Sequence, residues 1–252
     1  MHRPSLRFSA PYFFCGLSLL SLAAIAEQAD IAAPPKHLAQ AEKLVDNLKG
    51  AQENVYGGGK RHIDWAPDEC AARTVCSSFM TLLLQHTYGW TSDAFQDKMH
   101  STNPEAGDYH DAIVDRRGFK QVRHMSALRP GDILAVKYTD HHVSSDGVED
   151  TGHVMLVREA PVLMESKKPV IPGTQQYRVV IIDSSASGHG PTDTRAKPEG
   201  GFTGGIGSGT IRLYADASGE IEGYTWSNTT SSPYYTGPAR DLVAGRLKFT
   251  DW

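Results

Sequence analysis

The amino-acid sequence predicts an α+β fold in which N-terminal helices pack on a mostly antiparallel sheet. Helical patterns fill the first half of the chain, whereas short apolar runs bounded by turn residues follow from Ile133 onward. The linkers between these runs are too short for helical crossovers, so we expect successive strands to be antiparallel. Helices followed by a meander of strands are typical of the α+β class.

The first helix is predicted directly after Pro34 and Pro35. Apolar residues then recur every three or four positions and stop at Gly50. This spacing places them on one face, which we expect to lie against the core. The apolar positions are Leu38, Ala41, Leu44, Val45 and Leu48.

The central helix is predicted to begin near Thr74, whose side-chain oxygen suits a helix N-cap. Cys76 then falls in the first turn, ahead of a dense apolar run that continues to Leu84. The positive end of the helix dipole would favour the thiolate form of this residue. A single Cys before an apolar run is also compatible with a packed, unreactive side chain.

The remaining elements follow from turn residues and from a change of period. We expect two short helices, three strands and a final hairpin, with a Gly-, Ser- and Thr-rich stretch between Ser184 and Gly209. In order, these segments are Ser92–Met99, Asp108–Val114, Ile133–Val136, Val154–Val157, Tyr177–Asp183, Thr210–Tyr214 and Ile221–Trp226.

The chain divides into four predicted segments. Residues 1–26 have a basic start, an apolar stretch and a small-residue cleavage site at Ala26, as in a secretory signal peptide. Residues 27–50 form a linker and the first helix, 51–226 the catalytic domain, and 227–252 an irregular extension with one short helix near Asp241. We therefore expect a periplasmic or secreted protein without stable membrane insertion after cleavage.

Composition limits the partners and the cysteine chemistry. The formal net charge is −4, and it becomes about −6 without the predicted signal peptide, which carries two Arg and no acid. Nothing in this balance suggests a nucleic-acid partner. Only Cys70 and Cys76 then remain, and a disulfide between them would block the nucleophile.

A general base and an orienting group are predicted at strand ends. His153 begins one strand and Asp183 ends the next, so both side chains should lie at the same rim of the sheet. A thiolate needs such a base, and the base needs a third group to fix its tautomer. Cys76, His153 and Asp183 are therefore the predicted catalytic residues, with no cofactor and no metal.

Four short motifs in order resemble the NlpC/P60 cysteine peptidases, a permuted papain-like family that trims bacterial cell-wall peptides. They are Tyr56-Gly57-Gly58, Cys76-Ser77-Ser78-Phe79, Arg129-Pro130-Gly131-Asp132-Ile133 and Gly152-His153-Val154. The resemblance implies that Cys76 is the nucleophile and His153 the base, with Asp183 as the third polar residue. It also implies a peptidoglycan stem peptide or another amide substrate, and a Tyr56 hydroxyl near the sulfur that helps to hold the substrate carbonyl.

Departures from the family pattern keep other readings open. Val75 stands where the family usually has Asp, and Asp183 where it commonly has His, Asn or Gln, so the chain could be an inactive wall-binding module. His141 and His142, with Asp140 and Asp146, raise the possibility of a metal-dependent hydrolase. The segment from His189 to Arg195 is expected to form either a substrate lid, with Arg195 gripping a carboxylate of an acidic peptide, or a flexible surface loop.

Overall fold

The computed structural model describes residues 33–49, 53–139 and 150–252. The predicted signal peptide and the group Asp140, His141, His142 and Asp146 lie outside these ranges. Four α-helices are present in the described chain: α1 (Lys36–Asn47), α2 (Cys76–Tyr88), α3 (Ser92–Met99) and α4 (Ala106–Val114). None of the helices in these ranges is long and apolar enough to cross a membrane.

The strands form two sheets. A small sheet has the order β1-β3-β2, with β1 (Asn54–Tyr56) parallel to β3 (Ala71–Thr74) and β2 (His62–Asp64) antiparallel to it. The large sheet has nine strands in the order β11-β10-β9-β8-β6-β5-β12-β4, with β7 beside β8, and every pairing is antiparallel. Its strands are β4 (Phe119–Val122), β5 (Ile133–Tyr138), β6 (Gly152–Val157), β7 (Val162–Met164), β8 (Gln175–Ser185), β9 (Gly205–Ala215), β10 (Ile221–Thr225), β11 (Tyr234–Tyr235) and β12 (Arg240–Leu247).

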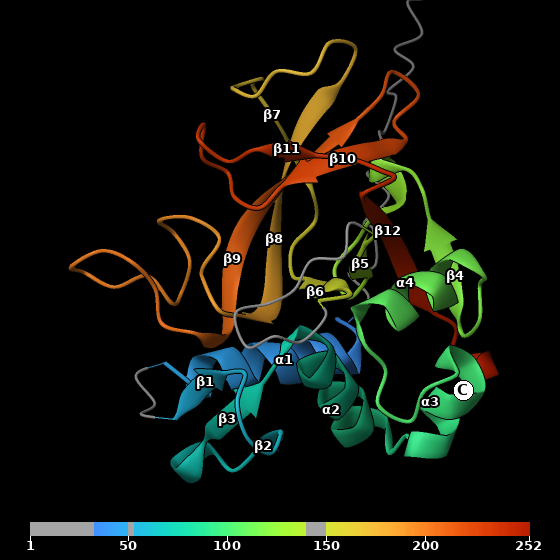
Figure 1. Ribbon diagram of the computed structural model, residues 1–252, viewed down its shortest axis with the longest axis vertical. Coiled ribbons are helices and arrows are strands. Elements are labelled where there is room, and N and C mark those ends of the chain that lie inside the picture. The colour runs from blue at the N-terminus through green and yellow to red at the C-terminus, as the bar shows by residue number, and fades with distance from the viewer. Residues whose placement is uncertain (1–32, 50–52, 140–149) are drawn as a thin grey trace, which may run out of the picture. The chain divides into compact units, whose positions relative to one another are not determined.

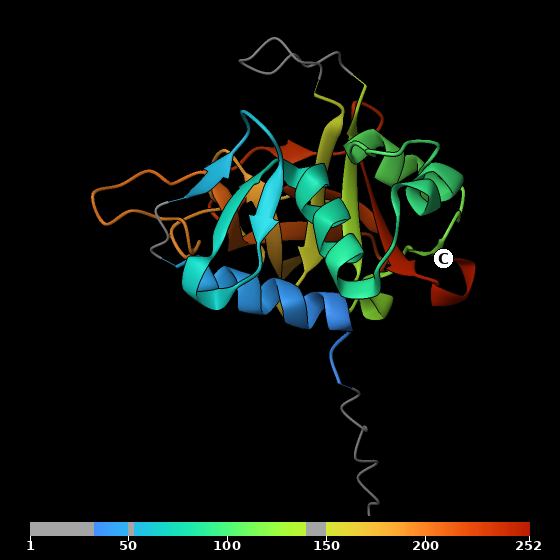
Figure 2. The same cartoon turned by 90° about the horizontal axis from the view of Figure 1, so that it is seen from below.

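The large sheet is buried on both faces. On β5, Ile133 and Ala135 join a core under the helices, whereas Leu134 and Val136 join a second core on the other face. Helix α2 packs on β6 and β8, and α1 packs on α2 (Figures 1 and 2). Strand β10 contacts β12 although several strands separate them in the sheet, so the sheet curls around the second core. Burial on both faces explains why these strands read as continuous apolar runs.

The predicted α+β class is confirmed, as is the mostly antiparallel sheet. Helices α1 and α3 and the order β5-β6-β8 agree with the sequence patterns, while α4 begins two residues before the predicted Asp108. The predicted hairpin is present as β9 and β10, and β9 begins already at Gly205.

The prediction of an irregular C-terminal extension is wrong. Residues 227–252 contribute β11 and β12, and β12 lies inside the large sheet between β5 and β4. The predicted short helix near Asp241 is instead part of β12, which pairs Leu242 with Val136. The domain therefore does not end at Trp226, because the last residues complete its sheet.

Candidate active site

Cys76 is the first residue of α2, and β3 delivers the chain to it. Thr74 is not the N-cap, contrary to the prediction, because it ends β3 and its hydroxyl donates to Ser184 Oγ at 2.8 Å. Val75 occupies the cap position, and its N–H donates to Ser78 Oγ at 2.9 Å. The first backbone N–H groups of a helix have no partner within it, so they surround Cys76 with positive dipole ends.

His153 lies beside this helix start. The Cys76 sulfur is 3.9 Å from the carbonyl oxygen of Gly152, the residue directly before His153 on β6. His153 Nε2 donates at 2.6 Å to Oδ2 of Asp183, which lies on the neighbouring strand β8. The structure therefore brings together Cys76, His153 and Asp183, which the sequence analysis placed at the ends of a helix and two strands.

The electrostatics of the site favour a charged imidazole. Burial by itself favours the neutral ring of His153, but the negative charge of Cys76 and hydrogen bonds with Asp183 and Cys76 outweigh it. Together they raise the pKa of His153 to about 10. Because this value lies well above neutrality, the ring carries a proton that it can give to a leaving group.

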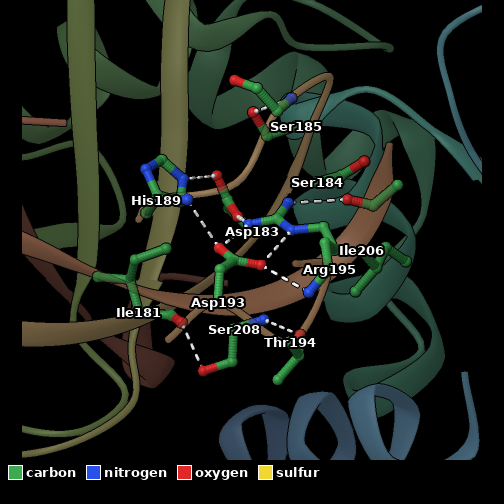
Figure 3. A network of polar contacts seen from close by, with 12 residues as sticks. Ile181, Asp183, Ser184, Ser185, His189, Asp193, Thr194, Arg195, Ile206 and Ser208 are labelled. Carbon is green, nitrogen blue, oxygen red and sulfur yellow. Dashed lines mark hydrogen bonds and ion pairs between the residues drawn. The ribbon is translucent and has the colours of Figure 1, made fainter. Parts of the chain in front are cut away.

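Asp183 is fully buried and accepts hydrogen bonds from three side chains, of which Figure 3 shows His189 and Arg195. Its Oδ2 accepts from both His153 and His189, at 2.6 and 2.7 Å, and its Oδ1 accepts from Arg195 Nη2 at 2.8 Å. Burial alone would raise the pKa of Asp183, but the charges of Arg195 and His189 and these hydrogen bonds hold it well below 3.8. The carboxylate is thus fixed in both charge and orientation.

Arg195 does not face a substrate, so the prediction that it grips a substrate carboxylate is wrong. The residue is 3% exposed, and its guanidinium donates to Asp183, to both oxygens of Asp193 and to Gly205 O, all at 2.8–2.9 Å. A buried carboxylate such as Asp183 is stable only beside a buried cation, so the segment that carries Arg195 packs against the interior. The segment is anchored by the buried side chains of His189, Asp193 and Arg195, while Pro191, Thr192 and Thr194 are exposed.

His189 belongs to the site, although the sequence analysis assigned it only to the predicted lid segment. It is 5% exposed, and its Nδ1 lies 2.7 Å from the carbonyl oxygen of Trp226 while its Nε2 lies 2.7 Å from Asp183 Oδ2. Both partners are hydrogen-bond acceptors, so the ring bridges the Trp226 carbonyl and the Asp183 carboxylate.

The alternating glycines in the first half of β9 were the available signal in the sequence for this buried network. On a strand, Gly207 and Gly209 face the same side. A Cβ on Gly207 would lie 2.5 Å from Arg195 Nε, and one on Gly209 would lie 2.2 Å from Asp193 Oδ2. The two glycines therefore leave room for the side chains of Arg195 and Asp193.

Aromatic side chains surround the Cys76–His153 pair. Tyr56 lies at the end of β1, near Cys76. Burial of the phenol, followed by the negative charges of Cys76 and Asp150, raises the pKa of Tyr56 far above 10. The Tyr56 phenol therefore keeps its proton. The ring of Trp226 stands at 88° to that of His153, with centroids 5.3 Å apart.

Both described cysteines are free thiols, so no Cys70–Cys76 disulfide blocks the sulfur. Cys70 lies outside α2 and is partly exposed. Burial, followed by the charge of Asp64, raises its pKa, which keeps this second thiol protonated at neutral pH. Cys70 therefore serves as an internal reference for the reactivity of Cys76.

His153, Asp183 and His189 could also be considered as metal ligands, because their donor atoms lie within 4.8 Å of one another. Two imidazoles and a carboxylate form a recurring ligand set for transition metals. Here, however, both rings donate hydrogen bonds to the carboxylate, and the Arg195 guanidinium contacts its other oxygen. A cation would have to displace these bonds and lie near a fixed positive charge.

Comparison with known proteins identifies one relative. The chain is 34% identical over 225 residues to the uncharacterized protein R653 of Acanthamoeba polyphaga mimivirus, covering 84% of this chain and 96% of the viral protein. No family model matches the chain, and no solved structure matches it.

Proposed function

We propose that this chain, which belongs to one family with the uncharacterized mimivirus protein, is a thiol hydrolase that cleaves an amide bond through an acyl-enzyme at Cys76. The observation that carries the proposal is the short hydrogen bond from His153 to a buried, ionised Asp183, with Cys76 close enough to raise the pKa of His153. These contacts support the assignment of Cys76 as nucleophile, His153 as base and Asp183 as orienting group.

The reaction follows from these positions. The Cys76 thiolate attacks the carbonyl carbon, and protonated His153 gives its proton to the departing amine, which leaves a thioester. His153 then takes a proton from water as the water attacks the thioester, and the acid product leaves with the sulfur restored. Asp183 holds the ring in place and stabilises its positive charge throughout.

Tyr56 fits the role of oxyanion donor. Its raised pKa keeps the phenol protonated, so its O–H can donate to the oxygen that becomes negative when the carbonyl is attacked. The backbone N–H groups at the start of α2 supply further donors beside Cys76. A site with these donors stabilises the tetrahedral intermediate more than the planar substrate.

The proposed substrate is a peptidoglycan stem peptide, and the proposed location is periplasmic or secreted. The four motifs that resemble NlpC/P60 peptidases support the substrate, and the N-terminal pattern of residues 1–26 supports the location. We also propose that the α+β fold is of the NlpC/P60 type. The order of the four motifs supports this assignment.

A metal-dependent hydrolase is the second candidate function. The grouping of His153, Asp183 and His189 favours it, and the hydrogen bonds described above oppose it. An inactive wall-binding module is the remaining alternative, which the departures at Val75 and Asp183 motivate.

Incubation with purified wall fragments, followed by mass spectrometry, tests the proposal. The wild-type protein and Cys70→Ala should release products that differ by one hydrolysed amide bond, whereas Cys76→Ala should release none. Intact-protein mass measurement should detect an acyl group on Cys76 after brief exposure to an activated ester. Turnover by Cys76→Ala that stops on chelation would replace the thiol mechanism with the metal mechanism. Wall binding without turnover by any form would favour the inactive module.

A further inference from the structure

A basic hollow of about 560 Å³ lies along β4, at the end of the large sheet. Strands β5 and β12 separate β4 from β6 (Figure 1). Because β6 carries His153, the hollow is distinct from the candidate active site. Six of its lining residues can carry positive charge, and no acidic residue lines it within the described chain. These six residues are Arg116, Lys120, Arg123, His124, Arg246 and Lys248.

Three of the basic side chains already have acidic partners. Arg246 binds Asp132 at 2.8 Å, and Lys248 binds Asp251 at 2.6 Å. Arg123 is 4.0 Å from Glu220, with both side chains about half exposed, so this pair neutralises little.

The other three have no side-chain partner in the described part of the chain. Arg116, Lys120 and His124 are exposed at the hollow, and no described residue hydrogen-bonds or ion-pairs with their side chains. Positive charge therefore gathers in one hollow of a chain whose total formal charge is −4. Such a local excess attracts anions to this site.

Protection of an edge strand explains only part of this charge. Lysine on an edge strand discourages pairing with other chains, which accounts for Lys120 on β4. It does not account for Arg116, which follows α4, or for Lys248, which follows β12. Residues from three separate elements thus bring positive charge to the same hollow.

We infer that the hollow binds an anion with several phosphate groups. Guanidinium groups match the oxygens of phosphate with two parallel hydrogen bonds, and Arg116, which has no side-chain partner in the described chain, is available for such contacts. A terminal phosphate carries up to about two negative charges, whereas a carboxylate or a phosphate within a polymer carries one. A short row of phosphates therefore neutralises the unpaired cations within the hollow more compactly than acidic side chains do. The ligand is either a free oligophosphate or the phosphates along a polymer.

Calorimetric titration of the full chain with sodium tripolyphosphate tests the inference. Arg116→Glu and Lys120→Glu should each weaken binding by about tenfold or more, because each removes a charge-assisted contact and adds repulsion. Lys43→Glu on α1 changes the net charge equally but does not line the hollow, so its affinity should equal that of the wild type. Thermal melting should verify that all three variants are folded.

Two further ligands distinguish the sources. Binding of an oligothymidylate that Arg116→Glu weakens would support phosphates along a polymer, and binding of tripolyphosphate alone would support a free oligophosphate. Binding of poly-glutamate in preference to tripolyphosphate would overturn the phosphate assignment. No binding of tripolyphosphate at low salt, or equal binding by all variants, would overturn the site itself.

Discussion

Replacement of Arg195 by Met is the most direct test of how the candidate site is held together. Arg195 donates to two buried carboxylates and to the carbonyl of Gly205, and only 3% of its surface is exposed. Removal of one partner from a buried ion pair costs about 3–5 kcal/mol, because the remaining charge stays buried. A domain is stable by only about 5–15 kcal/mol, so the variant should lose a large part of its free energy of unfolding.

Urea unfolding at neutral pH measures this loss, with Arg178→Met as the matched control. Arg178 lies 3.8 Å from Glu159, and both side chains are more than one-third exposed, so its replacement should cost at most about 1 kcal/mol. Arg195→Lys keeps the charge but not the planar fork, and should fall between the two. A loss of less than about 1 kcal/mol in Arg195→Met would refute the claim that Arg195 compensates the buried carboxylates.

Acid unfolding provides a second readout for the same change. The pKa of Asp183 is depressed, so its contribution to stability is complete above pH 3.8 and is lost as the pH falls through the lower folded-state value. Without the Arg195 charge, the pKa of Asp183 should rise toward the ordinary value. The acid transition of Arg195→Lys should therefore stay near that of the wild type, whereas the transition of Arg195→Met should move to higher pH.

Three other changes test single contacts. His110 lies 3.0 Å from Asp111 and 2.9 Å from Asp241; burial opposes its charge, but these hydrogen bonds raise its pKa above 6.5. His110→Gln should remove stability that the wild type has in full below pH 6.5 and loses as the pH rises through the raised pKa; parallel melting curves from pH 5 to 9 would contradict this. Tyr56→Phe should lower kcat about 10²-fold with little change in KM, and an unchanged kcat would remove Tyr56 from the oxyanion site. His189→Gln removes a positive charge beside the buried carboxylate and should move the acid limb of kcat/KM to higher pH, whereas a packing role alone would leave that limb in place.

Local sequence patterns were sufficient to predict the helices that bury one continuous face and the strands that consist of one apolar run. The three- and four-residue spacing from Leu38 to Leu48 corresponds to α1, and the apolar runs at Ile133 and Val154 correspond to β5 and β6. In each of these segments, the residues that define the element are also the residues that pack. Hydrophobic periodicity therefore contains most of the information needed.

Strand β12 could not be predicted in the same way, because its conformation depends on distant partners. Arg240–Leu247 has no clear alternation, and the segment becomes a strand by pairing with β5 and β4, more than 100 residues earlier in the chain. Glycine is needed at position 245 because Ile113 of α4 occupies the space of a side chain, with its Cγ1 2.5 Å from the position of a Cβ. Such fits between distant segments leave little trace in a local window.

The candidate site was predictable to the extent that its residues lie at element ends. Cys76 begins a helix, and His153 and Asp183 lie near the ends of neighbouring strands, so topology alone brings them together. The position of Arg195 was not predictable from its polar, Gly-rich surroundings, which resemble those of an exposed loop. Only the alternation of Gly207 and Gly209 indicated that bulky side chains approach β9 there.

The balance of buried charges explains why His189, Asp193 and Arg195 accompany Cys76, His153 and Asp183 in the candidate site. If Cys76 is a thiolate, then His153, His189 and Arg195 supply three positive charges to match Cys76, Asp183 and Asp193. Buried charges are tolerated when each is paired and hydrogen-bonded, and this set meets that condition. With a neutral thiol and a protonated His153, the set would carry an excess positive charge in a buried environment. The interior network therefore disfavours a divalent cation, which would add two further positive charges at Asp183.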